Sequence, residues 1–337
     1  MHKKNEKIDL VYLWCDGREP AFQERKAQYL AEDAQPKTVN IAGDVRFFDN
    51  EELRYSLRSL EMYAPWINHV YIITDRQVPY WLNTDCPKVT VVDHSEIMPQ
   101  ELIPCFNSTV IEHFLPNVPH LENKFIFGND DTFFAAPVRP QDFFQGEKPI
   151  VRVREMTRFT KVKQALFKLT GYYEKIEYKE YLSILSSLDL LEATYGEKGC
   201  YYTHHNFDGF TRANYLRTLQ KFAKEFEHSK RFRFRNKSCL QRIIFGLDAV
   251  YSGHAVLDIV QPVKNDQQKV FSFFGKEYKL EQAQHILEHN QPKLFCLNAC
   301  NKTDPSIKQH SKEFLERLFP EPSQFEKQFL SQRKEDF

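Results

Sequence analysis

Two adjacent carboxylates separate two apolar runs in the segment FIFGNDDTFF, residues 125–134. Asp130 and Asp131 are suited to a hard divalent ion such as Mg²⁺ or Mn²⁺, which takes oxygen ligands and leaves coordination positions for phosphate groups. Asn-Asp-Asp is equally good turn chemistry between the two strands of a hairpin. The pattern by itself therefore leaves both a metal site and a simple hairpin turn open.

Polar residues also follow other short apolar runs. Asp16 and Gly17 come directly after the first run, and Asp75 ends the second. Nearly continuous apolar runs of this length are typical of strands that are buried on both faces of a parallel sheet. The predicted strands are IDLVYLW (8–14), HVYIITD (69–75), KVTVVD (88–93) and KFIFGNDD (124–131).

Helices are predicted between these strands. DNEELRYSLRSLEMYAPW (49–66) begins with Asp49 or Asn50 as cap, repeats leucine with helical spacing and stops before Pro65. FNSTVIEHFL (106–115) is a second predicted helix. The alternation of strands and helices predicts a doubly wound α/β fold, in which ligands bind outside the carboxyl ends of the strands. The aspartates at the strand ends should therefore meet at one edge of the sheet.

Composition limits the classes of function. The 337 residues are 42% hydrophobic and include 46 basic and 46 acidic side chains, so no overall charge draws the molecule to nucleic acid. Seven scattered cysteines indicate reduced thiols, and Cys296 with Cys300 lacks the second pair of a structural zinc site. Neither a secretory signal nor the roughly 18 apolar residues of a membrane span is present, which favours the cytoplasm.

These segments together resemble the Stealth family of sugar-phosphate transferases. The family includes bacterial capsular and exopolysaccharide phosphotransferases and the catalytic region of the animal N-acetylglucosamine-1-phosphotransferase. Four blocks carry the resemblance and extend over most of the chain. They are IDLVYLWCDG (8–17), the long block from RFFDNEELRYS to FIFGNDDTFFAAPV (46–138), THHNFDGFTRANYLRTLQKF with RFRFRN (203–236), and KLFCLN (293–298).

The resemblance implies a glycosyltransferase-A-like fold with a mostly parallel sheet that binds a nucleotide-diphosphate sugar, by default UDP-N-acetylhexosamine. A hydroxyl of a growing capsular or exopolysaccharide glycan would attack the β-phosphate. Sugar-1-phosphate would move to form a phosphodiester, and nucleoside monophosphate would leave. Mg²⁺ or Mn²⁺ would be held at the block that matches Asp130 and Asp131.

The resemblance also implies roles for further side chains. Phosphoryl transfer depends on positioning and charge neutralisation, so Arg54 and Arg235 join Asp131 as candidate catalytic residues. His204 is the candidate general base or phosphate ligand, because hydroxyl attack on phosphorus can use a base. The candidates for substrate binding are Asp16, Gly17, Asp75, Asn107, Ser108, Arg233, His205 and Asn298.

Each of these candidates has an ordinary structural alternative. The alternation RFRFRN (231–236) predicts a strand whose arginines share one face, which could grip phosphate or simply be solvated. Asn107 or Ser108 could cap the predicted helix that follows. Arg58 lies four residues after Arg54 on the same face of the predicted helix, and an exposed helix arginine such as Arg58 is usually only solvated.

The order of segments predicts the domain organisation. Residues 1–150 form the first part of a nucleotide-sugar-binding core, residues 151–200 a lysine-bearing helical insertion, and residues 201–310 the second part of the core. The tail, 311–337, is predicted to form two short amphipathic helices separated by prolines. Lysines of the insertion could hold an anionic acceptor or be solvated, and peripheral association with the inner face of the cell membrane stays open.

Two other functions are compatible with the same residues. An ordinary metal-dependent glycosyltransferase would use the same core but attack the anomeric carbon and release nucleoside diphosphate. A non-catalytic carbohydrate-binding module would bind glycan without turning over any donor. The nucleotide that is released, or its absence, distinguishes these functions from sugar-1-phosphate transfer.

Overall fold

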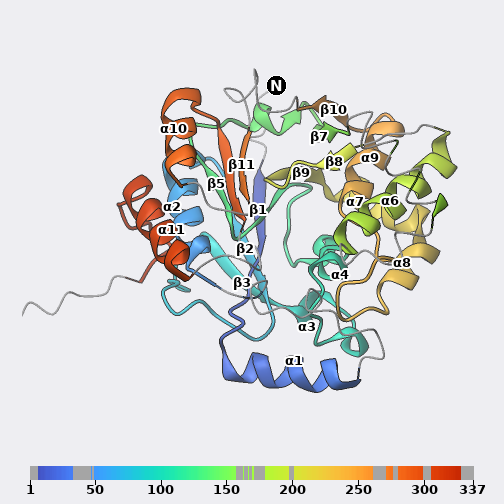
Figure 1. The fold of residues 1–337 in the computed structure, drawn as a ribbon, viewed down its shortest axis with the longest axis horizontal. Coiled ribbons are helices and arrows are strands. Elements are labelled where there is room, and N and C mark those ends of the chain that lie inside the picture. The colour runs from blue at the N-terminus through green and yellow to red at the C-terminus, as the bar shows by residue number, and fades with distance from the viewer. Residues whose placement is uncertain are drawn as a thin grey trace, which may run out of the picture.

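The protein is an α/β structure, seen here in a computed structural model that describes residues 7–32, 47, 49–156, 162, 166, 169–170, 179–196, 201–260, 271–275, 280–298 and 305–327 (Figure 1). The strands are β1 (Ile8–Leu13), β2 (Val70–Thr74), β3 (Val89–Asp93), β4 (Lys124–Asn129), β5 (Thr132–Phe134), β6 (Phe144–Gln145), β7 (Lys148–Glu155), β8 (Tyr201–Thr203), β9 (Asp208–Thr211), β10 (Val256–Ile259), β11 (Phe271–Gly275) and β12 (Leu294–Asn298). The helices are α1 (Pro20–Glu32), α2 (Glu52–Tyr63), α3 (His94–Ile97), α4 (Ser108–Glu112), α6 (Lys179–Tyr195), α7 (Arg212–Lys221), α8 (Ala223–Ser229), α9 (Ile243–Tyr251), α10 (Leu280–Asn290) and α11 (Pro305–Leu318).

The central sheet has the order β3-β2-β1-β4-β9, with parallel pairing throughout except between β4 and β9. Both faces of its inner strands are buried, as the continuous apolar runs predict. On one face Leu10 and Ile126 pack with Leu53 of α2, and on the other Val11 and Phe127 pack into the core beneath α6 to α9. The predicted α/β class and the mostly parallel sheet are confirmed.

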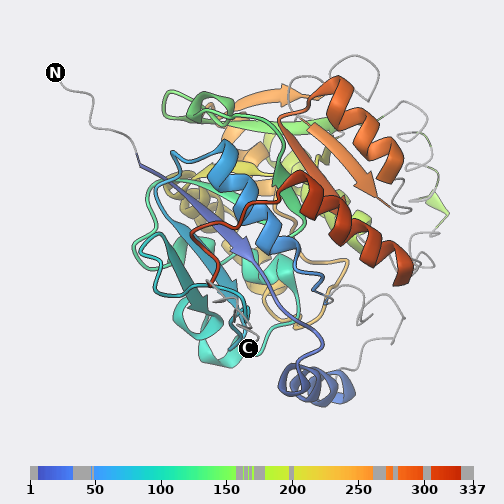
Figure 2. The ribbon, with the colours of Figure 1, turned by 90° about the vertical axis from the view of Figure 1, so that its left-hand side faces the viewer.

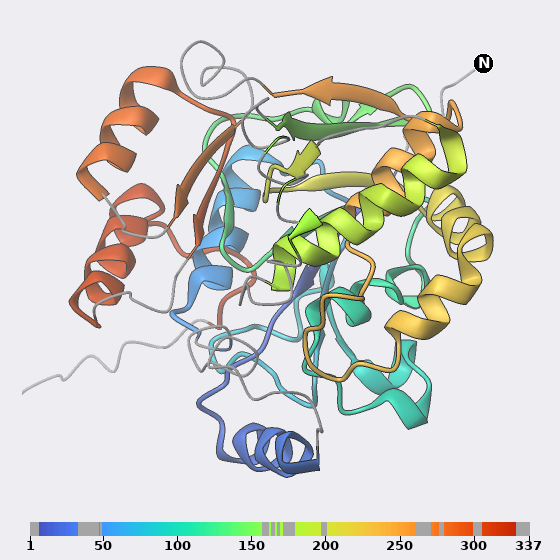
Figure 3. The ribbon, with the colours of Figure 1, turned by 45° about the vertical axis from the view of Figure 1, so that its right-hand side comes forward.

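Helices cover both sides of this sheet. Figure 2 shows α2 and α11 lying side by side over one face, and Figure 3 shows α6, α7, α8 and α9 over the other. α2 spans the predicted helix and ends before Pro65, but its N-cap is Glu51, whose side chain makes no capping hydrogen bond. Capping by Asp49 or Asn50 is therefore wrong: the carboxylate of Asp49 accepts hydrogen bonds from the indole of Trp14 and the N–H of Glu51, and the amide of Asn50 donates to Ser311.

The chain changes direction between β4 and β5. β5 pairs with β12 in a three-stranded sheet with β11, so the chain leaves the central sheet at the turn formed by Asp130 and Asp131. The two strands on either side of the pair are not a hairpin. The turn exists, but it connects two sheets and places both carboxylates at the boundary between them.

The segments predicted as insertion and tail differ in part from the prediction. Residues 151–155 belong to β7, which pairs with β8 and β10, and α6 accounts for the described helical part that follows. In the tail, α11 is helical, but residues 323–327 run without helix, and Glu326 forms a β-bridge with Leu82. The predicted second tail helix is wrong over the residues that the structure describes.

Buried ion pairs hold the segment 323–327 against α2. Glu326 accepts hydrogen bonds from Arg58 Nε at 2.7 Å and from Arg54 Nε at 2.5 Å, and the side chains of Arg58 and Glu326 are each 3% exposed. Arg54 also pairs with Glu51, which in turn binds Lys312 of α11. Burial opposes ionisation of Glu326, yet Arg58 and Arg54 hold its pKa below the ordinary value.

Replacing Glu326 by Gln should lower the free energy of unfolding by about 3 kcal/mol, because it leaves a buried guanidinium without its counter-charge. Urea denaturation of the two proteins measures the difference. Glu321→Gln, an exposed change in the same segment, should leave the urea midpoint unchanged. Equal midpoints for wild type and Glu326→Gln would show that the ion pairs do not hold the segment.

Candidate active site

The carboxyl ends of the parallel strands meet at one edge of the central sheet. Leu13, the last residue of β1, pairs with Ile73 of β2 on one side and with Asn129 of β4 on the other. The residues that follow these strands therefore lie together, as the doubly wound topology requires. They include Asp16 after β1 and the Asp130–Asp131 turn after β4.

The loop before β9 reaches the same edge from the opposite direction. β9 is antiparallel to β4 and pairs Asp208 with Phe127, so the chain enters β9 beside the end of β4. His204 and His205 lie in this loop. Gly128 admits the loop, because a Cβ at that position would lie 2.4 Å from the ring of Phe207.

Asp130 lies in a group of carboxylates. Burial, followed by the charges of Asp131, Glu52 and Asp49, raises the pKa of Asp130 well above the ordinary value. Burial and Asp49 raise the pKa of Glu52 to about 8, and burial with the neighbouring Asp16 raises that of Asp49 to about 6. Mutual repulsion of this kind is relieved by a bound cation.

The protonation of Glu52 predicts a stability change with pH. Its pKa of about 8 in the folded protein exceeds its ordinary value of 4.5, so ionisation destabilises the fold as the pH rises through this window. With chelator present, raising the pH from 6 to 8 should cost the wild type at least about 1 kcal/mol of unfolding free energy relative to Glu52→Gln. Urea denaturation at both pH values measures this difference, and an identical pH dependence of the two proteins would contradict it.

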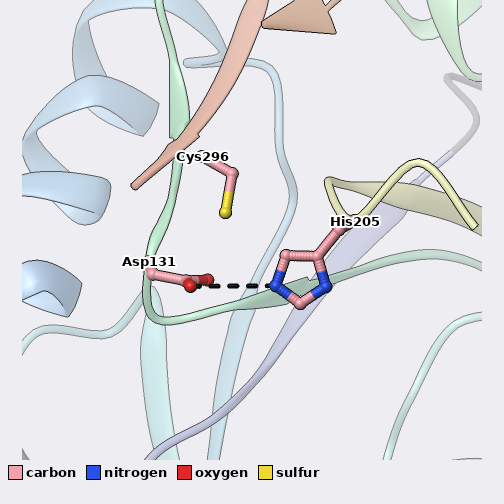
Figure 4. A group of neighbouring side chains, drawn as sticks. All are labelled: Asp131, His205 and Cys296. Carbon is pink, nitrogen blue, oxygen red and sulfur yellow. Dashed lines mark ion pairs between the residues drawn. The ribbon is translucent and has the colours of Figure 1, made fainter. Parts of the chain in front are cut away.

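Asp131 faces a second group of side chains (Figure 4). A carboxylate oxygen of Asp131, a ring nitrogen of His205 and the sulfur of Cys296 lie within 4.8 Å of one another. Nε2 of His205 is 3.8 Å from Oδ2 of Asp131, and Oδ1 of Asp131 is buried without a hydrogen-bond partner. His205 has a φ of 53°, a left-handed backbone that is uncommon for a residue with a side chain. Burial and the charge of Asp131 raise the pKa of the Cys296 thiol.

The two neighbouring histidines have different surroundings. His204 is 2% exposed, and its Nε2 is 2.9 Å from Oδ1 of Asp208. The other carboxylate oxygen of Asp208, Oδ2, accepts a hydrogen bond from Arg242. Burial lowers the pKa of His204, so the neutral form is favoured. The side chain of His205 is 28% exposed and lies against Asp131. The ring of His205 is therefore the more accessible of the two.

Asp16 and Gly17 are held at the sheet edge by other loops. Arg18 forms a two-point ion pair with Asp16, with Nε and Nη2 at 2.9 and 3.1 Å from the two carboxylate oxygens. The side-chain amide of Gln77 donates to the carbonyl of Asp16 and accepts from its N–H. A Cβ at Gly17 would lie 2.4 Å from Cβ of Phe47, so only glycine fits there.

Several predicted site residues have structural partners instead. Asp75 accepts a hydrogen bond from Arg25 of α1. Arg54 is paired with Glu51 and Glu326, as described above. Ser108 does receive a hydrogen bond from Arg235 at 3.0 Å, which joins two of the predicted residues. Asn298 ends β12, and its side chain lies outside the described residues.

Asn107 and Arg233 hold two loops together. The amide of Asn107 donates to the carbonyls of Phe232 and Phe234 and does not cap α4. Arg233 donates to the carbonyls of Leu102 and Pro104, among others. Residues 231–236 are not a strand, so the prediction that both guanidinium groups share a strand face is wrong.

Sequence reasoning missed three members of the site. Asp49 was interpreted as a possible helix cap, Glu52 was given no role at the site, and Cys296 was one of the seven cysteines interpreted as reduced thiols. The first two stand four residues and one residue before Leu53, where the start of a helix already favours acids, so residue type gave no separate signal of a ligand site. For Cys296 the only signal was its place inside the fourth block.

The fold and the site define an α/β protein with a carboxylate-rich ligand edge. The model of Stealth protein conserved region 2 matches residues 46–151, and that of conserved region 4 matches residues 284–336. The capsular polysaccharide phosphotransferase fcs1 of Haemophilus influenzae is 30% identical over 296 residues, 86% of this chain and 78% of that protein. The chain belongs to the Stealth family.

Other relatives match over shorter segments. The capsular polysaccharide phosphotransferase LcbA of Neisseria meningitidis is 42% identical over 43% of this chain and 39% of its own length. The exopolysaccharide phosphotransferase SCO6023 of Streptomyces coelicolor is 46% identical over 41% of this chain and 23% of its own length. These two alignments thus cover less than half of each relative.

The solved structures that match this chain include glycosyltransferases. The galactosyltransferase LgtC, in complex with donor and acceptor sugar analogues, matches with a TM-score of 0.44 at 10% identity, over 94% of this chain and 98% of that one. The WbbM bifunctional glycosyltransferase matches with a TM-score of 0.44 at 11% identity, over 93% of this chain and 50% of that one. Among the described residues, none of the helices has the length and apolar character needed to cross a bilayer.

Proposed function

We propose that this protein transfers sugar-1-phosphate from a nucleotide-diphosphate sugar to a hydroxyl of a capsular or exopolysaccharide glycan. The product is a phosphodiester, and nucleoside monophosphate is released. The observation that carries the proposal is the group of carboxylates at the ligand edge, Asp49, Glu52, Asp130 and Asp131, beside the imidazole of His205. The names of the relatives, capsular and exopolysaccharide phosphotransferases, support the same reaction.

The carboxylates suit a hard divalent ion. Their pKa values are raised because several acids share one half-buried site, and a cation would allow all of them to ionise together. Asp130 and Asp131 would hold Mg²⁺ or Mn²⁺, with Glu52 and Asp49 behind them. When bound, the ion would neutralise charge on the diphosphate.

His205 is the residue that we assign to the acceptor hydroxyl. Its imidazole is part exposed at the ligand edge and faces Asp131, with Nε2 3.8 Å from the carboxylate oxygen. It would take the proton as the hydroxyl attacks the β-phosphorus. His204 would have a positioning role: its hydrogen bond to Asp208 would hold the loop in which His205 lies.

The donor and the location follow from the same proposal. UDP-N-acetylhexosamine is the donor to test first, and the acceptor is a glycan chain. Residues 1–150 and 201–310 would form the catalytic core, and Arg235 with Ser108 would contact the sugar or a phosphate at its margin. We place the reaction in the cytoplasm, with peripheral association at the inner membrane face.

A screen of nucleotide sugars with a glycan acceptor and Mg²⁺ tests the proposal. Chromatography of the released nucleotide should show monophosphate, and chelation with EDTA should stop its release. Release of diphosphate would identify an ordinary glycosyltransferase instead. Glycan binding without turnover of any donor would identify a binding module, and turnover that continues in EDTA would remove the divalent ion from the account.

A further inference from the structure

We propose that Asp131, His205 and Cys296 bind an ion of the Zn²⁺ class, and that this ion inhibits the transfer reaction. The binding site is argued from the described residues alone. The inhibition rests on the proposed function, because it assigns roles in transfer to Asp131 and His205.

The three ligand atoms already lie near one another. They come from separate elements: the turn after β4, the loop before β9 and the strand β12. All of them lie within 4.8 Å of each other, and Figure 4 shows the three side chains directed toward a common point. Tetrahedral zinc, with bonds of about 2.0–2.3 Å, places its ligand atoms roughly 3.5 Å apart. Each atom therefore needs to move by about 1 Å or less.

The donor set indicates which ion fits. Zinc is bound by thiolate, imidazole and carboxylate, and three such protein ligands leave one position for water or substrate. Mg²⁺ does not take a thiolate, because it prefers oxygen. The corner formed by His205 and Cys296 therefore differs in selectivity from the carboxylates around Asp130, although Asp131 belongs to both.

The backbone holds two of the ligands in place. Cys296 pairs with Thr132 across β12 and β5, and the N–H of Leu297 donates to the carbonyl of Asp131 at 2.9 Å. His205 has a left-handed φ of 53°, a conformation that persists only where the surroundings impose it. The sheet thus fixes the sulfur beside the carboxylate, and the strained loop directs the imidazole toward them.

Binding of this ion would compete with transfer. It would occupy Asp131, which the divalent ion of the reaction needs, and it would engage the imidazole that accepts the proton. Micromolar Zn²⁺ should therefore suppress transfer measured in millimolar Mg²⁺, and an excess of a zinc-selective chelator should restore it.

Cobalt spectroscopy of the whole chain tests the binding site directly. Co²⁺ added to the wild type should give the near-ultraviolet charge-transfer band of a thiolate–cobalt bond, with the strong visible bands of a tetrahedral ion. Cys296→Ser should abolish the charge-transfer band, whereas Cys86→Ser, which changes a buried cysteine that contacts Gln324, should keep it. Weak visible bands without charge transfer, or a band lost only in Cys15→Ser or Cys300→Ser, would overturn the proposal.

If Cys296→Ser does not fold, a second variant tests the same site. His205→Asn keeps a residue that tolerates the left-handed backbone and should weaken Zn²⁺ binding in calorimetry by at least roughly 10-fold. Unchanged Zn²⁺ affinity would overturn the site. These outcomes can be distinguished from failure of the proposed function. If the protein shows no transferase activity, the cobalt spectrum still decides whether the Zn²⁺ site exists. If Mg²⁺-dependent transfer is found without a thiolate band, only the Zn²⁺ site is rejected.

Discussion

Asp131→Asn should lower the rate of nucleoside monophosphate release by at least about 1,000-fold, because it removes a charged oxygen from the place where a cation and the diphosphate would meet. The fold should survive, since the carbonyl of Asp131, which accepts the hydrogen bond from Leu297, is unchanged. Initial rates at saturating donor and Mg²⁺ measure the effect.

The matched control for Asp131→Asn is Asp85→Asn, which makes the same change in an exposed loop after β2. Its rate should equal that of the wild type. Full activity of Asp131→Asn, with the circular dichroism spectrum of the wild type, would remove Asp131 from the site.

His205→Asn should reduce the transfer rate by about 100-fold or more with donor affinity retained, as expected for loss of a general base. Asparagine accommodates the left-handed backbone, so the loop should keep its conformation. Single-turnover rates and equilibrium binding of the donor separate the two effects.

His120→Asn is the control for this variant, because His120 is exposed and has a φ of 62°, close to that of His205. It should change neither rate nor affinity. His204→Ala, in contrast, should lower stability as well as activity, because it removes the buried imidazole that is paired with Asp208. A normal transfer rate for His205→Asn would show that His205 is not the general base.

The central sheet could be predicted because its strands carry local signals. Each apolar run is the length of one strand and ends in polar residues, and α2 has helical leucine spacing before Pro65. The pairing of β5 with β12 could not be predicted in this way, since the two strands are more than 150 residues apart and no local pattern specifies their partner. That pairing is what places Cys296 beside Asp131.

The candidate site was predicted in its carboxylate turn and less well around it. Acidic residues at the start of a helix are favoured by the helix dipole, so Asp49 and Glu52 gave no separate signal of a ligand site. The choice between His204 and His205 depends on which ring is buried beside Asp208 and which lies part exposed against Asp131, and residue types do not reveal this. Asn107 and Arg233 were predicted to bind substrate because their actual partners, backbone carbonyls of distant loops, cannot be recognised in the sequence.

Phosphorus NMR of the glycan product tests the central claim most directly. The purified wild-type enzyme is incubated with Mg²⁺, the donor selected by the nucleotide-sugar screen and the glycan acceptor, and the product is freed from nucleotides. Sugar-1-phosphate transfer predicts a phosphodiester resonance in the glycan, in an amount equal to the monophosphate released. A glycan that has gained the sugar but contains no phosphorus would contradict the account.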